Sequence, residues 1–319
     1  MSSKSPARQV PHYVAEFDDS ALGAVDAVRV SEKTSNLWID AWRDLRGRWM
    51  FWVSGVVILL VIVVALFPSL FTAEPPNDGC FLDNSNAGPA PGHPLGFTKQ
   101  GCDVFSRIVH GTSTSLSVGI LATLLVAGLG LIIGGFAGFF GGWIDSLLMR
   151  AGDIFFAIPY ILAAVVIMSV FIDYRNIVVI SLAIGLFSWP SSARILRSEI
   201  LRVKQSDFVM ASTAIGLSRV RTMAAHVIPN SIAPLIVVST VSIAASITAE
   251  ATLSFLGVGL PNNVYMSWGN DISAAQQDLR VNPMTLIYPS IALSVTVLSF
   301  IMLGETIREA LDPKARALR

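Results

Sequence analysis

The sequence predicts an all-α integral membrane protein, and three observations support this fold class. The 319 residues are 53% hydrophobic and only 14% charged, whereas a soluble domain carries about 25% charged residues. The apolar runs are continuous rather than alternating, which favours helices over barrel strands. Six runs are long enough to cross a bilayer, which takes about 20 helical residues. They lie at about 50–71, 114–140, 146–172, 176–198, 231–257 and 284–304.

The distribution of basic residues predicts that both termini lie in the cytoplasm. Of the 22 Lys and Arg residues, all but Lys99, Arg107, Arg175 and Arg280 fall in the segments that share a side with the N-terminus. Cytoplasmic segments of membrane proteins carry such an excess. The net charge is zero, so overall charge predicts no partner, and we expect no binding to nucleic acid.

The first residues of the chain are expected to stay outside the bilayer. Residues 1–36 are polar and lack the apolar core of a signal peptide, so we expect a disordered cytoplasmic tail. Residues 37–49 predict a helix in the inner membrane interface, because aromatic residues recur every three or four positions. The residues of this pattern are Trp38, Trp42, Leu45, Trp49 and Trp52. Leu45 is the one aliphatic member, and Trp52 falls at the start of span 1. The alternative is that span 1 starts early with an aromatic belt.

The segment after span 1, residues 72–112, is expected to be an extracellular loop rich in Pro, Gly and Asn. It holds the only two cysteines, Cys80 and Cys102. Two cysteines on the oxidising side of a membrane suggest a disulfide. A zinc site that includes His93 is the alternative, although the spacing is not that of a metal site. Two free thiols are the third possibility.

Residues 113–305 hold the remaining spans, and their small and helix-breaking residues predict how these spans pack. Gly130, Gly134, Gly138 and Gly142 recur every four residues, so one stripe of span 2 would allow another helix to approach closely. A role for this stripe in lining a pore stays open.

Two prolines and one acidic residue stand out in the later spans. Pro159 in span 3 and Pro190 in span 4 remove backbone hydrogen bonds, so each is expected to kink or interrupt its helix. Glu250 lies toward the outer end of span 5. A charge in a membrane is costly, so Glu250 should face the helix bundle or water. It is either part of a gate or a hydrogen-bonded structural acid.

A polar island, residues 199–230, separates two of the apolar runs. Ser206 or Asp207 can cap a short helix, and Gly216 can end it in the left-handed conformation that a helix C-terminus often needs. One face of this helix is apolar, with Phe208, Ala211, Ala214 and Ile215.

A second helix would follow Ser218, with Val220, Met223, Ala224 and Val227 on one side, and Pro229 would separate it from span 5. Its periodicity leaves two interpretations of the island open. It docks on a partner protein, or it lies on lipid.

The island resembles the cytoplasmic coupling loop of binding-protein-dependent ABC import permeases. The family pattern is Glu-Ala-Ala, three residues, Gly, and a stretch that ends in Leu-Pro. This chain has Met210-Ala211-Ser212, Gly216 and Ile228-Pro229-Asn230, so Met210 replaces the Glu and Ser212 the second Ala. Other segments resemble the C-type subunit of dipeptide and oligopeptide (Dpp/Opp) importers: His93-Pro94-Leu95-Gly96, Gly101 to Arg107, Gly141 to Asp145 with Met149, Arg150 and Asp153, Ala249 to Gly259, Ser267 to Asn270, and Ala310 to Pro313.

The resemblance implies a six-span type I importer fold with a short cytoplasmic C-terminal tail, residues 306–319, in a bacterial cell membrane. It implies that residues 206–217 contact an ATPase, and the residues concerned are Ser206, Asp207, Phe208, Met210, Ala211, Ser212, Gly216 and Leu217. Implied partners are a homologous B-type permease, two ATP-binding subunits or domains and an external solute-binding protein. ATP and Mg would bind the ATPase partners, with no cofactor or metal in this chain.

The implied cargo is a di- or oligopeptide, with nickel and glutathione as alternatives. The chain contains no Gly-x-x-x-x-Gly-Lys-Ser/Thr phosphate loop, so we do not expect it to hydrolyse ATP itself. Two functions of other classes fit the sequence less well. An ion-coupled secondary transporter would place ionisable groups near the middle of the membrane, and only Glu250 approaches that position. A membrane-embedded enzyme would need convergent catalytic groups, and no such constellation is evident.

Overall fold

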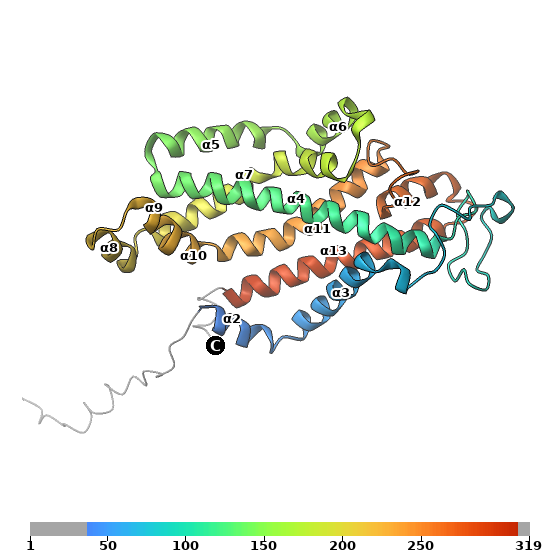
Figure 1. Ribbon diagram of the computed structural model, residues 1–319, viewed down its shortest axis with the longest axis horizontal. Helices are drawn as coiled ribbons and strands as arrows, with labels where there is room; N and C mark the ends of the chain where they lie inside the picture. The colour runs from blue at the N-terminus through green and yellow to red at the C-terminus, as the bar shows by residue number, and fades with distance from the viewer. Residues whose placement is uncertain (1–36, 312–319) are drawn as a thin grey trace, which may run out of the picture.

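The computed structural model describes residues 37–311, and these residues form a bundle of long helices (Figure 1). The expected tail, residues 1–36, lies outside the described residues. In chain order the helices are α2 Leu37–Leu45, α3 Trp49–Leu66, α4 Val104–Phe140, α5 Gly142–Ala157, α6 Tyr160–Val170, α7 Ile177–Val203, α8 Asp207–Ala214, α9 Arg219–Thr222, α10 Ile228–Ser231, α11 Ala233–Phe255, α12 Trp268–Ala275 and α13 Met284–Leu311. Single turns of 3-10 helix occur at Pro68–Leu70, Leu82–Asn84, Ile172–Tyr174 and Gln276–Asp278, and a π-helical turn at Met223–Val227.

The long helices α3, α4, α7, α11 and α13 run side by side (Figure 1). The short helices α8 to α10 lie at one end of the bundle, and the loop before α4 lies with α12 at the other. Within residues 37–311, five helices are long and apolar enough to cross a membrane, and α5 with α6 forms a sixth if the pair is one broken span. The fold class expected from the sequence is therefore confirmed.

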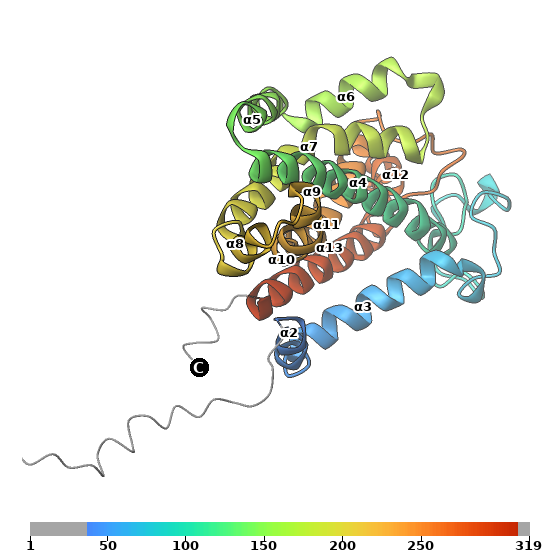
Figure 2. The same cartoon turned by 60° about the vertical axis from the view of Figure 1, so that its left-hand side comes forward.

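The break between α5 and α6 lies at Ile158 and Pro159, and the two helices differ in direction by 77° (Figure 2). Pro159 thus interrupts its span, as the sequence predicts. Pro190 does not, because α7 continues from Ile177 to Val203 with Pro190 inside it. The loss of one backbone hydrogen bond is tolerated there, since the following residues of α7 pack tightly on α4.

Three of the four glycines in the predicted stripe mediate this packing. A Cβ atom on Gly130 would lie 2.7 Å from Ser192, one on Gly134 would lie 2.4 Å from the Ala193 carbonyl oxygen, and one on Gly138 would lie 2.9 Å from Ile200. Gly142 is the exception, because α4 ends at Phe140. Gly142 is the first residue of α5, with φ +58° and open space around it.

The N-terminal helix α2 is separate from α3 and packs on the end of α13. Ala41 and Leu45 form a buried cluster with Ala310, and the Arg48 guanidinium bonds both Asp44 and Glu309. The indoles of the four tryptophans are exposed, so Leu45 does not share their surface. An exposed aromatic surface fits the expected interfacial helix, whose membrane position stays a prediction.

Several segment boundaries differ from those expected. The α2 helix ends at Leu45 rather than residue 49 and α3 at Leu66 rather than residue 71, while α7 continues to Val203, so residues 199–203 of the expected coupling loop are helical. The α4 helix begins at Val104, because the Asp103 carboxylate accepts a hydrogen bond from the Ser106 backbone N–H at 2.8 Å and caps it. Residues 104–112, assigned to the outer loop, are therefore helical. At the other end, α13 continues to Leu311, so residues 306–311 of the expected tail are helical and 312–319 lie outside the described residues.

Candidate functional site

The short helix α8 is built as the sequence predicts at its C-terminal end. Gly216 has φ +86°, its N–H donates to the Thr213 carbonyl at 3.0 Å, and the Leu217 N–H donates to the Ser212 carbonyl at 3.2 Å. This pair of bonds is the Schellman motif, which a left-handed residue closes. Gly216 occupies this position because a side chain would strain the backbone there.

The N-terminal end of α8 differs from the prediction in one respect. Ser206 is the N-cap residue, but its side chain makes no capping bond. Its hydroxyl instead donates to the Val203 carbonyl at 2.5 Å, so it is tied to the end of α7. Asp207 lies in the first turn, where a negative charge is favourable at the positive end of the helix dipole.

The two faces of α8 have different surroundings. Val209 and Ser212 are buried, and Val209 packs in a cluster with Leu196, Ile200 and Val227 at the base of the bundle. The opposite side is open: Phe208 is 45%, Met210 53% and Ile215 77% exposed. Ala211 is also exposed and Leu217 partly so. An exposed apolar face on a firmly packed helix is typical of a protein contact.

The segment after Gly216 is helical but irregular, and one expectation about it is wrong. Pro229 does not separate the second helix from span 5, because it lies in the first turn of α10. The π-helical turn at Met223–Val227 comes just before α10, and the break falls at Ile232. Of the four residues predicted on one side, Met223 and Val227 are buried while Val220 and Ala224 are exposed.

Glu250 lies far from α8, inside the bundle. Its side chain is fully buried and accepts hydrogen bonds from the hydroxyls of Ser115 at 3.2 Å and Ser254 at 2.9 Å. The Ser115 oxygen also accepts from the Trp268 backbone N–H at 3.3 Å. Glu250 thus links α4, α11 and the start of α12. Its side chain faces the bundle, as expected because a charged side chain exposed to lipid is energetically costly.

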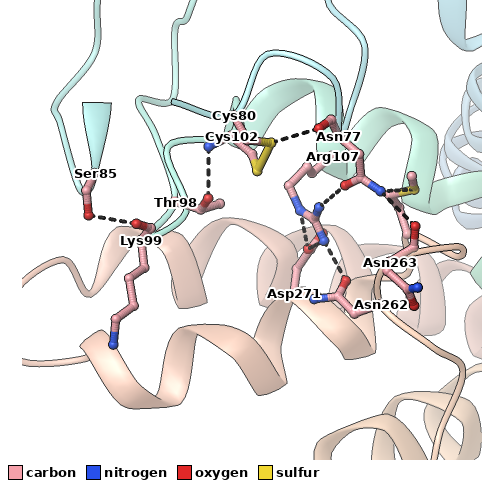
Figure 3. Close-up of a disulfide and its surroundings, with 11 residues drawn as sticks. Asn77, Cys80, Ser85, Thr98, Lys99, Cys102, Arg107, Asn262, Asn263 and Asp271 are labelled. Carbon is pink, nitrogen blue, oxygen red and sulfur yellow. Dashed lines mark hydrogen bonds and ion pairs between the residues drawn. A yellow bond between two sulfur atoms is a disulfide. The ribbon is translucent and has the colours of Figure 1, made fainter. Parts of the chain in front are cut away.

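A buried ion pair near the outer loop was not anticipated (Figure 3). Arg107 is 4% exposed, and its guanidinium donates to Asp271 at 2.7 Å, to Asn77 at 2.6 Å and to Asn262 at 2.7 Å. Burial raises the pKa of the Asp271 carboxyl, and the Arg107 charge opposes that shift. The network joins α4, α12 and two loops. The only sequence signal was that each charge lies in or next to a motif of the family resemblance.

Cys80 and Cys102 form a disulfide in the structure, with an S–S distance of 2.08 Å (Figure 3). The bond joins the loop to the residues just before α4. A zinc site is therefore not formed, because both thiols are used in the disulfide. His93 instead lies with its Nδ1 atom 3.3 Å from an Asp103 carboxylate oxygen. Within residues 37–311, no group of three metal-ligating side chains occurs.

Comparison with known proteins identifies the family. Residues 130–317 match the model of the binding-protein-dependent transport system inner membrane component, and residues 36–89 match the N-terminal TM domain of oligopeptide transport permease C. The chain is a C-type permease of the Opp/Dpp family of ABC importers. It is therefore a multi-pass inner membrane protein and not itself an ATPase, and it works with ATPase subunits and a binding protein.

Two similar proteins differ in the cargo that their names give. The glutathione transport system permease protein GsiD of Escherichia coli O6:K15:H31 is 33% identical over 297 residues, 93% of this chain and 97% of that protein. The oligopeptide transport system permease protein OppC of Bacillus subtilis is 32% identical over 300 residues, 94% and 97% of the two chains. A structure of the MetNI methionine ABC transporter covers 65% of this chain and 96% of its own, with a TM-score of 0.54 and 16% identity, which supports the fold alone.

Proposed function

We propose that this permease forms half of the translocation pathway of an ATP-driven importer of di- and oligopeptides, and that residues 206–217 couple it to an ATPase subunit. The observation that carries the coupling proposal is the two-sided packing of α8. Its exposed apolar residues Phe208, Met210 and Ile215 face away from a buried base formed with α7. A partner that pushes α8 would therefore also move α7.

The second half of the pathway would come from a homologous B-type permease. ATP and Mg would bind the two ATPase subunits, and ATP must favour one arrangement of the bundle over the other if it is to drive transport. The docked α8 carries that preference into the spans. Since Met210 stands where the family pattern has Glu, apolar packing contributes more to this contact than a charge does. Both termini of the chain face the cytoplasm in this arrangement.

A test of the coupling proposal compares two exposed phenylalanines. Phe208→Ala removes a large part of the apolar face of α8, whereas Phe81→Ala changes an exposed phenylalanine in the outer loop; the two are 45% and 66% exposed. Loss of a central aromatic contact costs about 2 kcal/mol or more at an interface. We expect the first variant to lose most ATPase copurification and transport and the second to keep both. Equal copurification and uptake for the two variants would contradict docking through α8.

Peptides are favoured as cargo because both named relatives carry molecules with a peptide-like backbone and charged ends. Glutathione is the alternative, supported by the 33% identical GsiD. Uptake of a labelled dipeptide into vesicles that contain the complete complex, with competition by unlabelled glutathione, separates the two. Competition by glutathione at equal concentration, with no competition by a second dipeptide, would favour glutathione.

A further inference from the structure

A cavity of about 290 Å³ lies beside the break between α5 and α6. Five helices contribute to its walls: α4, α5, α6, α7 and α11. Its polar residues are Tyr160 at the start of α6, Ser188 and Ser191 on α7, and Ser242 and Ser246 on α11. The cavity therefore gathers hydroxyl groups at a place where the spanning helices are otherwise apolar.

Among the described residues, all of these cavity hydroxyls except that of Ser188 lack the backbone hydrogen bond that several other serines in the same helices make. A serine inside a helix commonly donates to the carbonyl four residues earlier, as Ser188 does to Ile184 at 2.8 Å and Ser239 does to Leu235 at 2.7 Å. Within residues 37–311, Tyr160, Ser191, Ser242 and Ser246 make no such bond. A hydroxyl without a partner costs about 1–3 kcal/mol in apolar surroundings. These groups are therefore suited to water or a polar ligand.

An exposed charged pair lies next to the cavity residue Phe156. Arg194 and Asp153 form an ion pair with a 2.7 Å contact, and their side chains are 39% and 64% exposed. The Arg194 guanidinium also lies 4.5 Å from the ring centroid of Phe156, which lines the cavity. The distribution of basic residues places Arg194 on the cytoplasmic side, so this pair would stand between the cavity and the cytoplasm.

We propose that this cavity is the site where the transported peptide contacts this subunit. Each peptide unit carries one hydrogen-bond donor and one acceptor, and a hydroxyl can serve either. Tyr160, Ser191, Ser242 and Ser246 would bond the peptide backbone, and Asp153 and Arg194 would offer partners to its charged ends. Backbone contacts suit cargo of varied sequence. The inference rests on the proposed function and adds the residues that meet the cargo.

Single cysteines test the proposal, because the two native cysteines are joined to each other. Ser191→Cys and Ser246→Cys place a thiol in the cavity. Ser169→Cys is the matched control, since Ser169 is exposed on α6 and does not line the cavity. Each variant is assembled with its partner permease, ATPases and binding protein in proteoliposomes. A charged, membrane-impermeant methanethiosulfonate is then added with and without ATP and a transported peptide.

We expect the labelling rates of the cavity thiols to change about tenfold between nucleotide states, because ATP shifts the population between two arrangements of the bundle. Transported peptide should slow their labelling, and labelling should block uptake. Labelling of Ser169→Cys should leave uptake intact. Unchanged uptake after labelling at positions 191 and 246 would overturn the proposal. A labelling rate that is the same with and without transported peptide would also overturn it.

The wild-type complex separates this outcome from a failure of the proposed function. If the unmodified complex takes up no peptide in the presence of ATP, the proposed function is wrong. If it takes up peptide but the cavity thiols behave like the control, only the cavity assignment is wrong. Should one cysteine variant fail to assemble, Ser242→Cys on the same wall replaces it.

Discussion

Close packing of α4 on α7 makes Gly134→Ala the most informative stability test. The new Cβ atom would lie 2.4 Å from the Ala193 carbonyl oxygen and 3.0 Å from the Ala193 Cα atom. Both contacts are with backbone, so no side chain can rotate away. The two helices must separate by about 0.6 Å to bring the first contact to 3.0 Å, and that movement opens the contacts at Gly130 and Gly138 as well.

Overpacking of this kind costs about 1–3 kcal/mol. Alanine also favours the helix by about 0.5–1 kcal/mol over glycine. Gly128→Ala is the matched control: it lies on the same helix, gains the same helix preference and has no atom within 4 Å of its new Cβ. The difference in unfolding free energy between the two variants therefore isolates the packing cost, which we expect to be about 1–3 kcal/mol.

The assay is thermal unfolding of the purified complex in detergent, followed by tryptophan fluorescence and by retention of the monodisperse peak. We expect Gly134→Ala to melt several degrees below Gly128→Ala. If Gly134→Ala melts at or above the control, the close approach of α4 and α7 does not hold the bundle together, and the reasoning from the glycine stripe is wrong.

Two further predictions concern the outer loop and Glu250. Replacing Cys80 and Cys102 with serine should lower the free energy of unfolding by about 3 kcal/mol, the loop-entropy value for a separation of 22 residues. The variant should therefore have a lower Tm than the oxidised wild type, and this Tm should match that of the reduced wild type. Ready alkylation of both thiols without reductant would contradict the bridge. Glu250→Gln keeps the size and shape of the side chain to which the Ser115 and Ser254 hydroxyls bond. We therefore expect normal assembly, measured by copurification, and reduced peptide uptake. Normal uptake would assign Glu250 a structural role alone.

The apolar runs were enough to predict the bundle, because a helix in lipid must satisfy its own backbone hydrogen bonds. Two local signals were also reliable, although the predicted Ser206 cap and Pro229 break were not. Gly216 ends α8 and Pro159 breaks a span, since each acts on its own backbone. Pro190 shows the limit of this reasoning. Its local effect is the same as that of Pro159, but packing of α7 on α4 keeps that helix continuous.

The sequence by itself determined the membrane class, the approximate spans, the family resemblance and the polar island. Only the tertiary structure decided which charges and faces meet. Arg107 and Asp271 are 164 residues apart in the chain, and the hydroxyls of the cavity come from α6, α7 and α11. Periodicity describes one helix at a time, whereas these sites depend on how helices are placed against one another. For the same reason, Gly142 continues the four-residue spacing in the sequence but lies beyond the end of α4 and takes no part in its contact with α7.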